Sequence, residues 1–451
     1  MLGAITVFLL QTVLNWELIK LCSTAKEVFV MSYGEKMIQG LKDGNLEEAN
    51  QLFAQALKND SDEELYLLSD SLYELGFIEE TKAINLQLLE SYPENDELKV
   101  GLAEIAIESG DMESAMDWLA KVEETSDVYP QALLVSADLY YVQGLYEVSE
   151  QKLLQAKEVV GDEPAVIFAL AELHFSMGKY AQAIKGYEDL MVQGYDELSG
   201  INLSARCGGA YSALGDFEEA VNYLKQSLEE NEHVDTLFQL GFTYMQQKEY
   251  QRANESFFKL KELDPSYTSV YPYLAKGLEE ELRLDKAQEV IQEGLQYDEF
   301  NPELYVQGAN IYLKLEDEEA AEEYYQKAIE LDPDNAAYLL AYTNLLNKQE
   351  RFSETVEIIQ HALTEDEVDP QFYWNLAIAN EGLEEYEAAG NSFAKAYPSF
   401  RENASFLKNY ISYLREEGDR VFIKEVLSDY LRVEPSDEEM LSFYESINGN
   451  Y

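Results

Sequence analysis

The stretch EDEEAAEEYYQKAIELDPDN, residues 316–335, combines two features that point to different structures. Its Asp and Glu side chains could form a cation site, a set of catalytic acids or a solvated surface. Its Ala and Tyr residues recur at the three- and four-residue spacing of one helix face. The stretch alone does not choose between these interpretations, so the choice depends on whether the rest of the chain repeats the pattern.

Segments of the same pattern occur along most of the chain, as in GNLEEANQLFAQALKND (44–60) and GDFEEAVNYLKQSLEENE (215–232). In most of them a turn residue precedes a hydrophobic residue, then a small residue, then a bulky apolar or aromatic residue. The steps between turn residues run from 32 to 37 residues, and most are 34. The turn residues are Gly44, Gly76, Gly110, Gly144, Gly178, Gly215, Lys248, Leu282, Glu316, Glu350, Glu384 and Gly418. Such a period over twelve copies indicates a solenoid of stacked helical repeats.

The repeated unit resembles the tetratricopeptide repeat (TPR). Repeat nine carries the residues typical of that family, namely Tyr305, Gly308, Ala309, Tyr312, Ala321, Tyr325, Ala328 and Pro333. The resemblance covers residues 30–435, and the whole chain also resembles acidic repeat proteins of Gram-positive bacteria of the YpiA-like type. It implies an all-α fold, a right-handed α-solenoid (superhelix) of twelve tandem helix-turn-helix repeats.

We expect four segments in the chain. Residues 1–30 are an apolar N-terminal extension, 30–197 hold repeats one to five, 198–435 hold repeats six to twelve, and 436–451 form a capping helix and tail. The extension is either a mis-assigned start, with translation beginning at Met31, or a weak membrane anchor, because its apolar run is short for a membrane-spanning helix. The longer step through residues 191–200 predicts a hinge, and Ser436 is the expected N-cap of the capping helix.

Turn chemistry gives a further expectation. Glycine between the two helices of a repeat supplies a left-handed backbone conformation at little cost. Where Lys248 or Glu316 stands at that position, we expect a slightly strained turn.

The charge of the chain restricts its partners. Its 451 residues include 32 Lys and Arg against 88 Asp and Glu, so the formal net charge is −56. Such a field repels nucleic acid and anionic membrane and favours basic partners, although it also serves solubility alone. We therefore expect a basic protein or peptide partner, with no direct nucleic-acid binding and no membrane partner. Two isolated cysteines, Cys22 and Cys207, suit the reducing cytoplasm.

Motifs of catalysis and metal binding are absent from the sequence. A Gly-rich phosphate loop, a nucleophile elbow and an HExxH motif do not occur, and no Cys or His pair has metal-ligand spacing. We predict a protein that is not an enzyme, with no catalytic residues, no metal and no cofactor.

The family resemblance implies that the first helix of each repeat lines a concave groove. In repeats two to five this rule selects carboxylates and aromatic residues, which together suit Lys and Arg side chains through charge pairing and cation–π contact. The selected residues are Tyr66, Asp70, Tyr73, Glu74, Glu104, Glu108, Asp138, Tyr141, Phe168, Glu172 and Phe175.

Repeat six differs, because small residues such as Gly209, Ser212 and Ala213 leave the groove floor bare. Phe238, Phe242 and Met245 of repeat seven would stand beside that hollow as a wall, where an anchoring side chain of a partner could dock. The alternative for all these aromatic residues is plain helix packing.

The sequence therefore predicts a non-enzymatic scaffold or adaptor that holds a basic, Lys- or Arg-bearing partner in an acidic and aromatic groove. Two alternatives remain open. One is a membrane-tethered assembly factor anchored by residues 1–16, and the other is an anionic mimic that blocks a nucleic-acid-binding surface through its whole electric field.

Overall fold

The structure, a computed structural model, describes residues 31–362, 369–417 and 421–448. These residues form 25 α-helices and one two-stranded β-hairpin. The N-terminal extension, the choice between Met1 and Met31, and the turn residue Gly418 lie outside the described residues.

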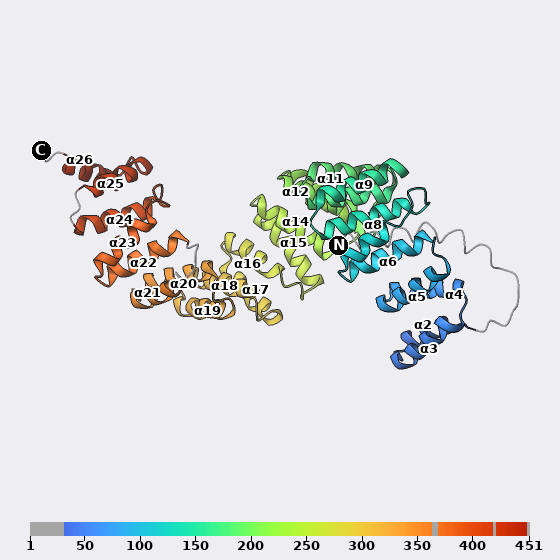
Figure 1. The fold of residues 1–451 in the computed structure, drawn as a ribbon. Helices are drawn as coiled ribbons and strands as arrows, with labels where there is room; N and C mark the ends of the chain where they lie inside the picture. Colours follow the sequence, from blue (N-terminus) through green and yellow to red (C-terminus); the bar gives the residue numbers. More distant parts are fainter. Residues whose placement is uncertain (1–30, 363–368, 418–420, 449–451) are drawn as a thin grey trace. The chain divides into compact units, whose positions relative to one another are not determined.

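The helices belong to two compact units, one ending at Gln247 and the other beginning at Lys248 (Figure 1). The first unit holds α2 (Tyr33–Lys42), α3 (Leu46–Asn59), α4 (Asp62–Glu74), α5 (Ile78–Ser91), α6 (Asp96–Glu108), α7 (Met112–Leu119), α8 (Tyr129–Val142), α9 (Tyr146–Val160), α10 (Pro164–Ser176), α11 (Tyr180–Val192), β1 (Glu197–Leu198), β2 (Ile201–Asn202), α12 (Leu203–Leu214), α13 (Phe217–Glu230) and α14 (Val234–Gln246). The second unit holds α15 (Tyr250–Leu263), α16 (Val270–Glu280), α17 (Leu284–Tyr297), α18 (Pro302–Lys314), α19 (Glu318–Leu331), α20 (Ala336–Lys348), α21 (Phe352–Ala362), α22 (Pro370–Gly382), α23 (Tyr386–Ala396), α24 (Ala404–Glu417), α25 (Phe422–Val433) and α26 (Glu438–Asn448).

Within each unit the helices pack in sequence order. A first helix packs against the second helix of its repeat, as α18 does on α19, and the second helix packs against the next first helix, as α19 does on α20. This arrangement confirms the predicted all-α fold of tandem helix-turn-helix repeats.

The predicted turn residues adopt the predicted backbone conformation. All eleven that lie in the described residues have a positive φ, for example 80° at Gly44 and 63° at Glu316. In the first unit these turn residues are all glycines. In the second unit they are Lys248, Leu282, Glu316, Glu350 and Glu384, whose Cβ atoms make the left-handed conformation costly.

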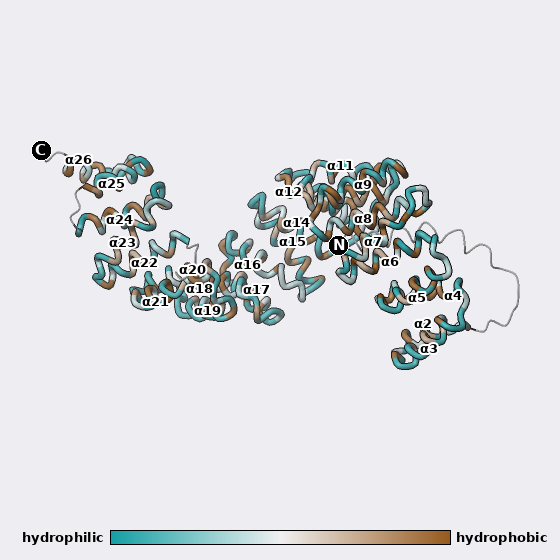
Figure 2. The backbone as a smooth tube through the Cα atoms, viewed as in Figure 1, coloured by the Kyte–Doolittle hydropathy of each residue, from teal (hydrophilic) through white to brown (hydrophobic). Residues whose placement is uncertain are grey.

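The acidic stretch 316–335 has mainly a structural role: one side of it packs inside the repeat and the other side faces solvent. Ala321 is fully buried where α19 meets α18, and Tyr325 beside it donates a hydrogen bond of 2.7 Å from its hydroxyl to Oδ1 of Asn310. Glu319 and Glu323 of the same helix are exposed. In Figure 2 the hydrophobic and hydrophilic residues accordingly alternate along the helices of the repeats.

The extra residues before repeat six form the hairpin β1–β2, whose strands pair Glu197 with Asn202 and Leu198 with Ile201. Leu198 is buried in a core cluster with Tyr187. The predicted hinge and the predicted division of repeats at residue 198 therefore fall inside the first unit, in a segment fixed by backbone pairing and by a buried side chain. Motion at this segment stays a prediction.

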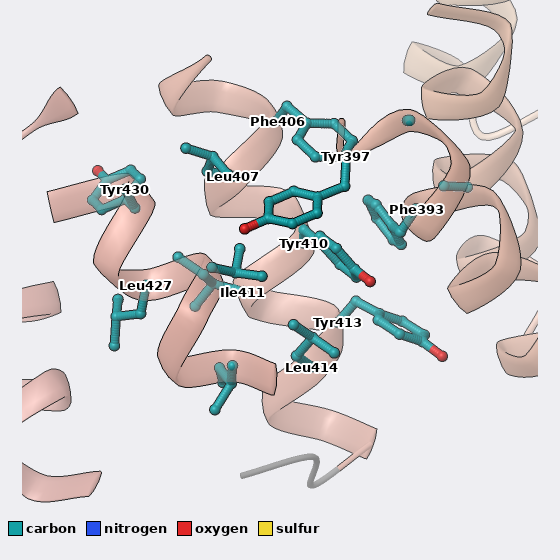
Figure 3. Close-up of a cluster of buried hydrophobic side chains, with 14 of the residues drawn as sticks. Phe393, Tyr397, Phe406, Leu407, Tyr410, Ile411, Tyr413, Leu414, Leu427 and Tyr430 are labelled. Atoms are coloured by element: carbon teal, nitrogen blue, oxygen red, sulfur yellow. The ribbon is translucent and has the colours of Figure 1, made fainter. Parts of the chain in front are cut away.

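The C-terminal repeats are packed around aromatic rings (Figure 3). Phe393 of α23 stacks on Tyr410 of α24 with ring centroids 4.9 Å apart, and the hydroxyl of Tyr397 donates to Oδ2 of Asp429 at 2.7 Å. Helix α26 packs on α25 at the end of the described chain. Its N-terminal cap is Asp437, whose Oδ1 accepts from the backbone N–H of Met440 at 3.1 Å. The expectation of Ser436 was wrong by one residue, because the carboxylate of Asp437 stands three residues before Met440.

We expect Glu316→Gly to raise the free energy of unfolding of the second unit by about 0.5–1 kcal/mol. The substitution removes the left-handed strain of a Cβ-bearing residue, and the greater entropy of glycine in the unfolded chain offsets part of that gain. Urea denaturation followed by circular dichroism measures the change.

The matched control is Glu323→Gly, at an exposed position inside α19, which should lower the same free energy by about 1 kcal/mol. If both substitutions destabilise the unit equally, the turn at Glu316 is not strained.

Candidate functional site

Carboxylates of three successive first helices gather around Tyr73. On α4, Asp70 and Glu74 lie one turn apart and Tyr73 follows Asp70 by three residues; Glu104 and Glu108 lie one turn apart on α6, and Asp138 comes from α8. The hydroxyl of Tyr73 donates a hydrogen bond of 2.7 Å to Oε1 of Glu108, so it links α4 to α6. We call this set the acidic face; it consists of Asp70, Tyr73, Glu74, Glu104, Glu108 and Asp138.

The acidic face is electrostatically crowded. Burial, with the charges of Glu97 and Glu74, raises the pKa of Asp70 to about 6. Burial, with the charges of Glu108 and Asp138, raises the pKa of Glu104 to about 7, although a hydrogen bond from Gln131 acts in the opposite direction.

The same surroundings act on the tyrosine at the centre. Burial and the hydrogen bond to Glu108 raise the pKa of Tyr73, and the charges of Glu104 and Asp138 add to that effect. The charged groups that shift these three pKa values are all carboxylates. A cation brought to the acidic face would therefore lower its electrostatic free energy.

Two predicted aromatic residues extend the acidic face to either side. Tyr66 of α4 is half-buried, and its hydroxyl accepts a hydrogen bond of 2.5 Å from Nδ2 of Asn95. Tyr141 of α8 is half-buried too and donates from its hydroxyl to Oγ of Ser176 at 3.2 Å. Both side chains bond to the following repeat and still present part of their rings to solvent.

Two of the predicted groove residues on α10 are internal. Phe168 is 0% exposed and packs against Tyr187. Glu172 is 7% exposed; Oε1 accepts from the Tyr187 hydroxyl at 2.6 Å, and Oε2 lies 2.9 Å from Nη2 of Arg206. Because α10 is apolar on most sides, neighbouring helices cover it, and we withdraw Phe168 and Glu172 as partner contacts. Asp138, at 8% exposure, is buried as well, so it acts on the acidic face through its charge and is not a partner contact either.

The predicted hollow at repeats six and seven is present as a cavity of about 580 Å³. Its lining comes from α10, α12, the turn after α12, the start of α13 and α14. We call it the α12 cavity; its lining residues are Phe175, Gly209, Ser212, Ala213, Leu214, Gly215, Phe217, Gln239, Phe242, Thr243 and Gln246. Of the three residues predicted as a wall, Phe242 lines the cavity, whereas Phe238 and Met245 are not among the lining residues.

Sequence reasoning missed several residues here. The lining is completed by Leu214, Gly215, Phe217, Gln239, Thr243 and Gln246. In addition, Arg206 neutralises Glu172 while its guanidinium lies 5.5 Å from the ring centroid of Phe175. A signal for Arg206 was available, since it is the one cation in the first helix of repeat six. Phe217 follows the turn glycine at the position that is hydrophobic in most repeats, and no local pattern marks it as a cavity residue.

The other chemical groups of the described residues give no second site. None of the described helices is long and apolar enough to cross a membrane. Across the described ranges, His, Cys, Asp and Glu do not come together in a group of three that could hold a metal ion. Cys207 is buried, and this burial, with the charge of Glu188, raises the pKa of its thiol to about 12.

Comparison with known proteins identifies the repeats. A model of the YpiA-like tetratricopeptide repeats matches residues 141–195, and a model of the YpiA-like C-terminal tetratricopeptide repeats matches residues 370–437. More general tetratricopeptide repeat models match residues 66–130, 203–234, 234–267 and 302–335.

The TPR repeat-containing protein YpiA of Bacillus subtilis is 36% identical over 90% of this chain and 96% of its own. The TPR repeat-containing protein MJ1428 of Methanocaldococcus jannaschii is 25% identical over 72% of this chain and 63% of its own. Among solved structures, a chain of the APC/C hetero-tetramer Cut9–Hcn1 aligns over 92% of this chain and 96% of its own, at 11% identity and a TM-score of 0.42. That superposition is too weak to carry an argument about the site.

We expect Glu104→Gln to stabilise the protein in a pH-dependent way. With a folded-state pKa near 7 against an ordinary value of 4.5, the folded protein retains this proton where the unfolded chain has lost it. The stability contribution of the protonated carboxyl is therefore complete below pH 4.5 and is lost as the pH rises through 7. The neutral amide should raise the free energy of unfolding by on the order of 1–2 kcal/mol at pH 8 and by little at pH 5.

Urea denaturation at the two pH values measures this difference. The control is Glu90→Gln, which changes an exposed carboxylate of α5. A gain for Glu104→Gln that is the same at pH 5 and pH 8 would contradict the raised pKa.

Proposed function

The chain belongs to the YpiA-like family of tetratricopeptide repeat proteins, and from this premise we propose that it is a non-enzymatic scaffold that binds a basic segment of a partner protein. Tetratricopeptide repeat proteins usually bind proteins or peptides, and neither of the two relatives named above carries the name of an enzyme. The two isolated cysteines and the net charge of −56 favour a cytoplasmic protein whose partner is neither nucleic acid nor membrane.

The observation that supports this proposal is the crowding of carboxylates at the acidic face. Glu74 and Glu108 are exposed, and Asp70 also keeps part of its surface in solvent although packing around its carboxyl raises its pKa; half-buried Tyr73 lies on the same face. Arginine or lysine side chains can pair with these carboxylates and approach the face of the tyrosine ring. Since one exposed ion pair contributes only about 0.2–1 kcal/mol, binding requires several cations on one segment and weakens with salt.

Asp70→Lys, Glu74→Lys and Glu108→Lys together should weaken binding of a basic peptide at least about tenfold at low salt. Three favourable pairs become repulsive, at roughly 0.5–1 kcal/mol each. The probe is a fluorescein-labelled peptide of eight residues in which arginine alternates with serine, and its affinity is measured by fluorescence anisotropy at low and high salt.

The control carries the same change in net charge on second helices, with Glu90→Lys, Asp117→Lys and Glu158→Lys at exposed positions of α5, α7 and α9. Its affinity should stay within about twofold of the unmodified protein. Equal losses in both triple variants would favour the anionic mimic, which acts through its whole field, over binding at the acidic face.

A further inference from the structure

The α12 cavity differs chemically from the acidic face. All its lining residues belong to the described part of the chain and none of them is charged, although Asp, Glu, Lys and Arg make up 27% of the sequence. Three phenylalanine rings line it, those of Phe175, Phe217 and Phe242. A cationic side chain placed here would lack a carboxylate partner, so the lining favours a neutral, largely apolar occupant.

The floor of the cavity has room because residue 209 is glycine. A Cβ atom added at Gly209 would lie 3.6 Å from Oε1 of Gln239 and 3.8 Å from Cζ of Phe175, which is ordinary van der Waals contact. At the adjacent Gly208 a Cβ would lie only 2.5 Å from Cγ of Leu224. Gly208 is therefore required for helix packing, whereas the missing side chain at Gly209 leaves space in the cavity.

One polar atom beside this floor lacks a hydrogen-bond partner. Oε1 of Gln239 is buried and accepts no hydrogen bond from any described residue. The neighbouring hydroxyls are paired, since Oγ1 of Thr243 lies 3.2 Å from Oγ of Ser212 and 2.8 Å from the backbone oxygen of Gln239. Because Oε1 exposes almost none of its surface, an occupant with one N–H or O–H donor would satisfy it once the Gln239 side chain turns toward the cavity, whereas a purely aliphatic side chain would not.

The cavity continues the row of first helices that carries the acidic face. Phe175 of α10 lines it, and α10 follows α8 in the same unit. At about 10 Å a step, the width of a helix with its side chains, the three steps from α6 to α12 cover roughly 30 Å. An extended segment spans that distance with about nine residues.

From these observations we infer that the α12 cavity binds an aromatic side chain carrying one hydrogen-bond donor, best met by tryptophan, on the same segment that binds the acidic face. The indole ring packs among Phe175, Phe217 and Phe242, and its N–H donates to Oε1 of Gln239. This inference rests on the proposed function, because the basic part of the segment is what brings the aromatic residue to the cavity.

The test uses two fluorescein-labelled peptides with two arginines, a nine-residue Gly/Ser spacer, and either tryptophan or serine. The unmodified full chain should bind the tryptophan peptide at least tenfold more tightly than the serine peptide. Gly209→Leu fills the cavity and should reduce that preference to less than twofold, without changing the affinity for the serine peptide. Gly209→Ala should reduce the preference in part while leaving the midpoint of thermal unfolding equal or higher, because alanine favours helix over glycine.

The matched control is Gly40→Ala, a helix glycine of α2 far from the cavity whose added Cβ meets nothing closer than 4.0 Å. It should keep the full preference for tryptophan. A preference that survives Gly209→Leu, or equal affinities of the unmodified protein for the two peptides, would overturn the inference. If the inference fails in this way while the serine peptide still loses affinity in the triple variant of the acidic face, the proposed function is supported without the inference about the cavity. No binding of either peptide would overturn both proposals.

The same peptides and variants distinguish two other possible occupants of the cavity from a partner's tryptophan. Displacement of the labelled tryptophan peptide by a peptide of residues 1–16 would assign the cavity to the chain's own N-terminal segment. Self-association of the full chain in sedimentation, lost in Gly209→Leu, would assign it to a second copy. Either result contradicts a partner's tryptophan as the occupant.

Discussion

The close approach of two helices at a buried small residue is the contact on which the rest of the structure depends. Ala49, Ala115, Ala183 and Ala321 are each fully buried on the second helix of a repeat. A larger side chain there would push the two helices apart and change the step to the next repeat. Because the step is nearly constant, first helices follow one another in register. The hydrogen bonds from Tyr73 to Glu108 and from Tyr141 to Ser176 both join residues 35 apart, about one repeat period.

The features that could be predicted from the sequence are those set within one repeat. The left-handed turns depend on chain geometry near residues such as Gly44 and Glu316, so the period located them correctly. The features that could not be predicted depend on contacts between helices. Phe168 and Glu172 stand at groove positions of their own repeat, but Tyr187 and Arg206 cover or pair with them. The α12 cavity was expected from its small residues, whereas the packing that adds Phe217 and Gln239 to it was not.

Carboxylates of the second unit such as Glu279 and Glu318 form ion pairs with basic side chains, which distinguishes them from the carboxylates of the acidic face. In the second unit, basic side chains on first helices meet acidic partners: Nζ of Lys314 lies 2.7 Å from Glu279, and Nζ of Lys348 lies 2.6 Å from Glu318. Glu279 is buried and also bonds to Lys276, so its charge is compensated inside the repeat stack. At the acidic face, in contrast, carboxylates raise one another's pKa values. Under the proposed function, a basic ligand would meet carboxylates without cationic partners at the acidic face, whereas Glu279 and Glu318 already have them.

The distribution of turn residues has a consequence for how the repeats separate. In the described part of the first unit every assigned turn between the two helices of a repeat uses glycine, whereas all five assigned turns of the second unit place a Cβ-bearing residue in the left-handed region. At about 1 kcal/mol or more each, those five turns together cost as much as the net stability of a small domain. Because repeats contact mainly their neighbours, this cost remains local. We therefore expect each of these repeats to open at a lower free energy than it would with glycine at its turn.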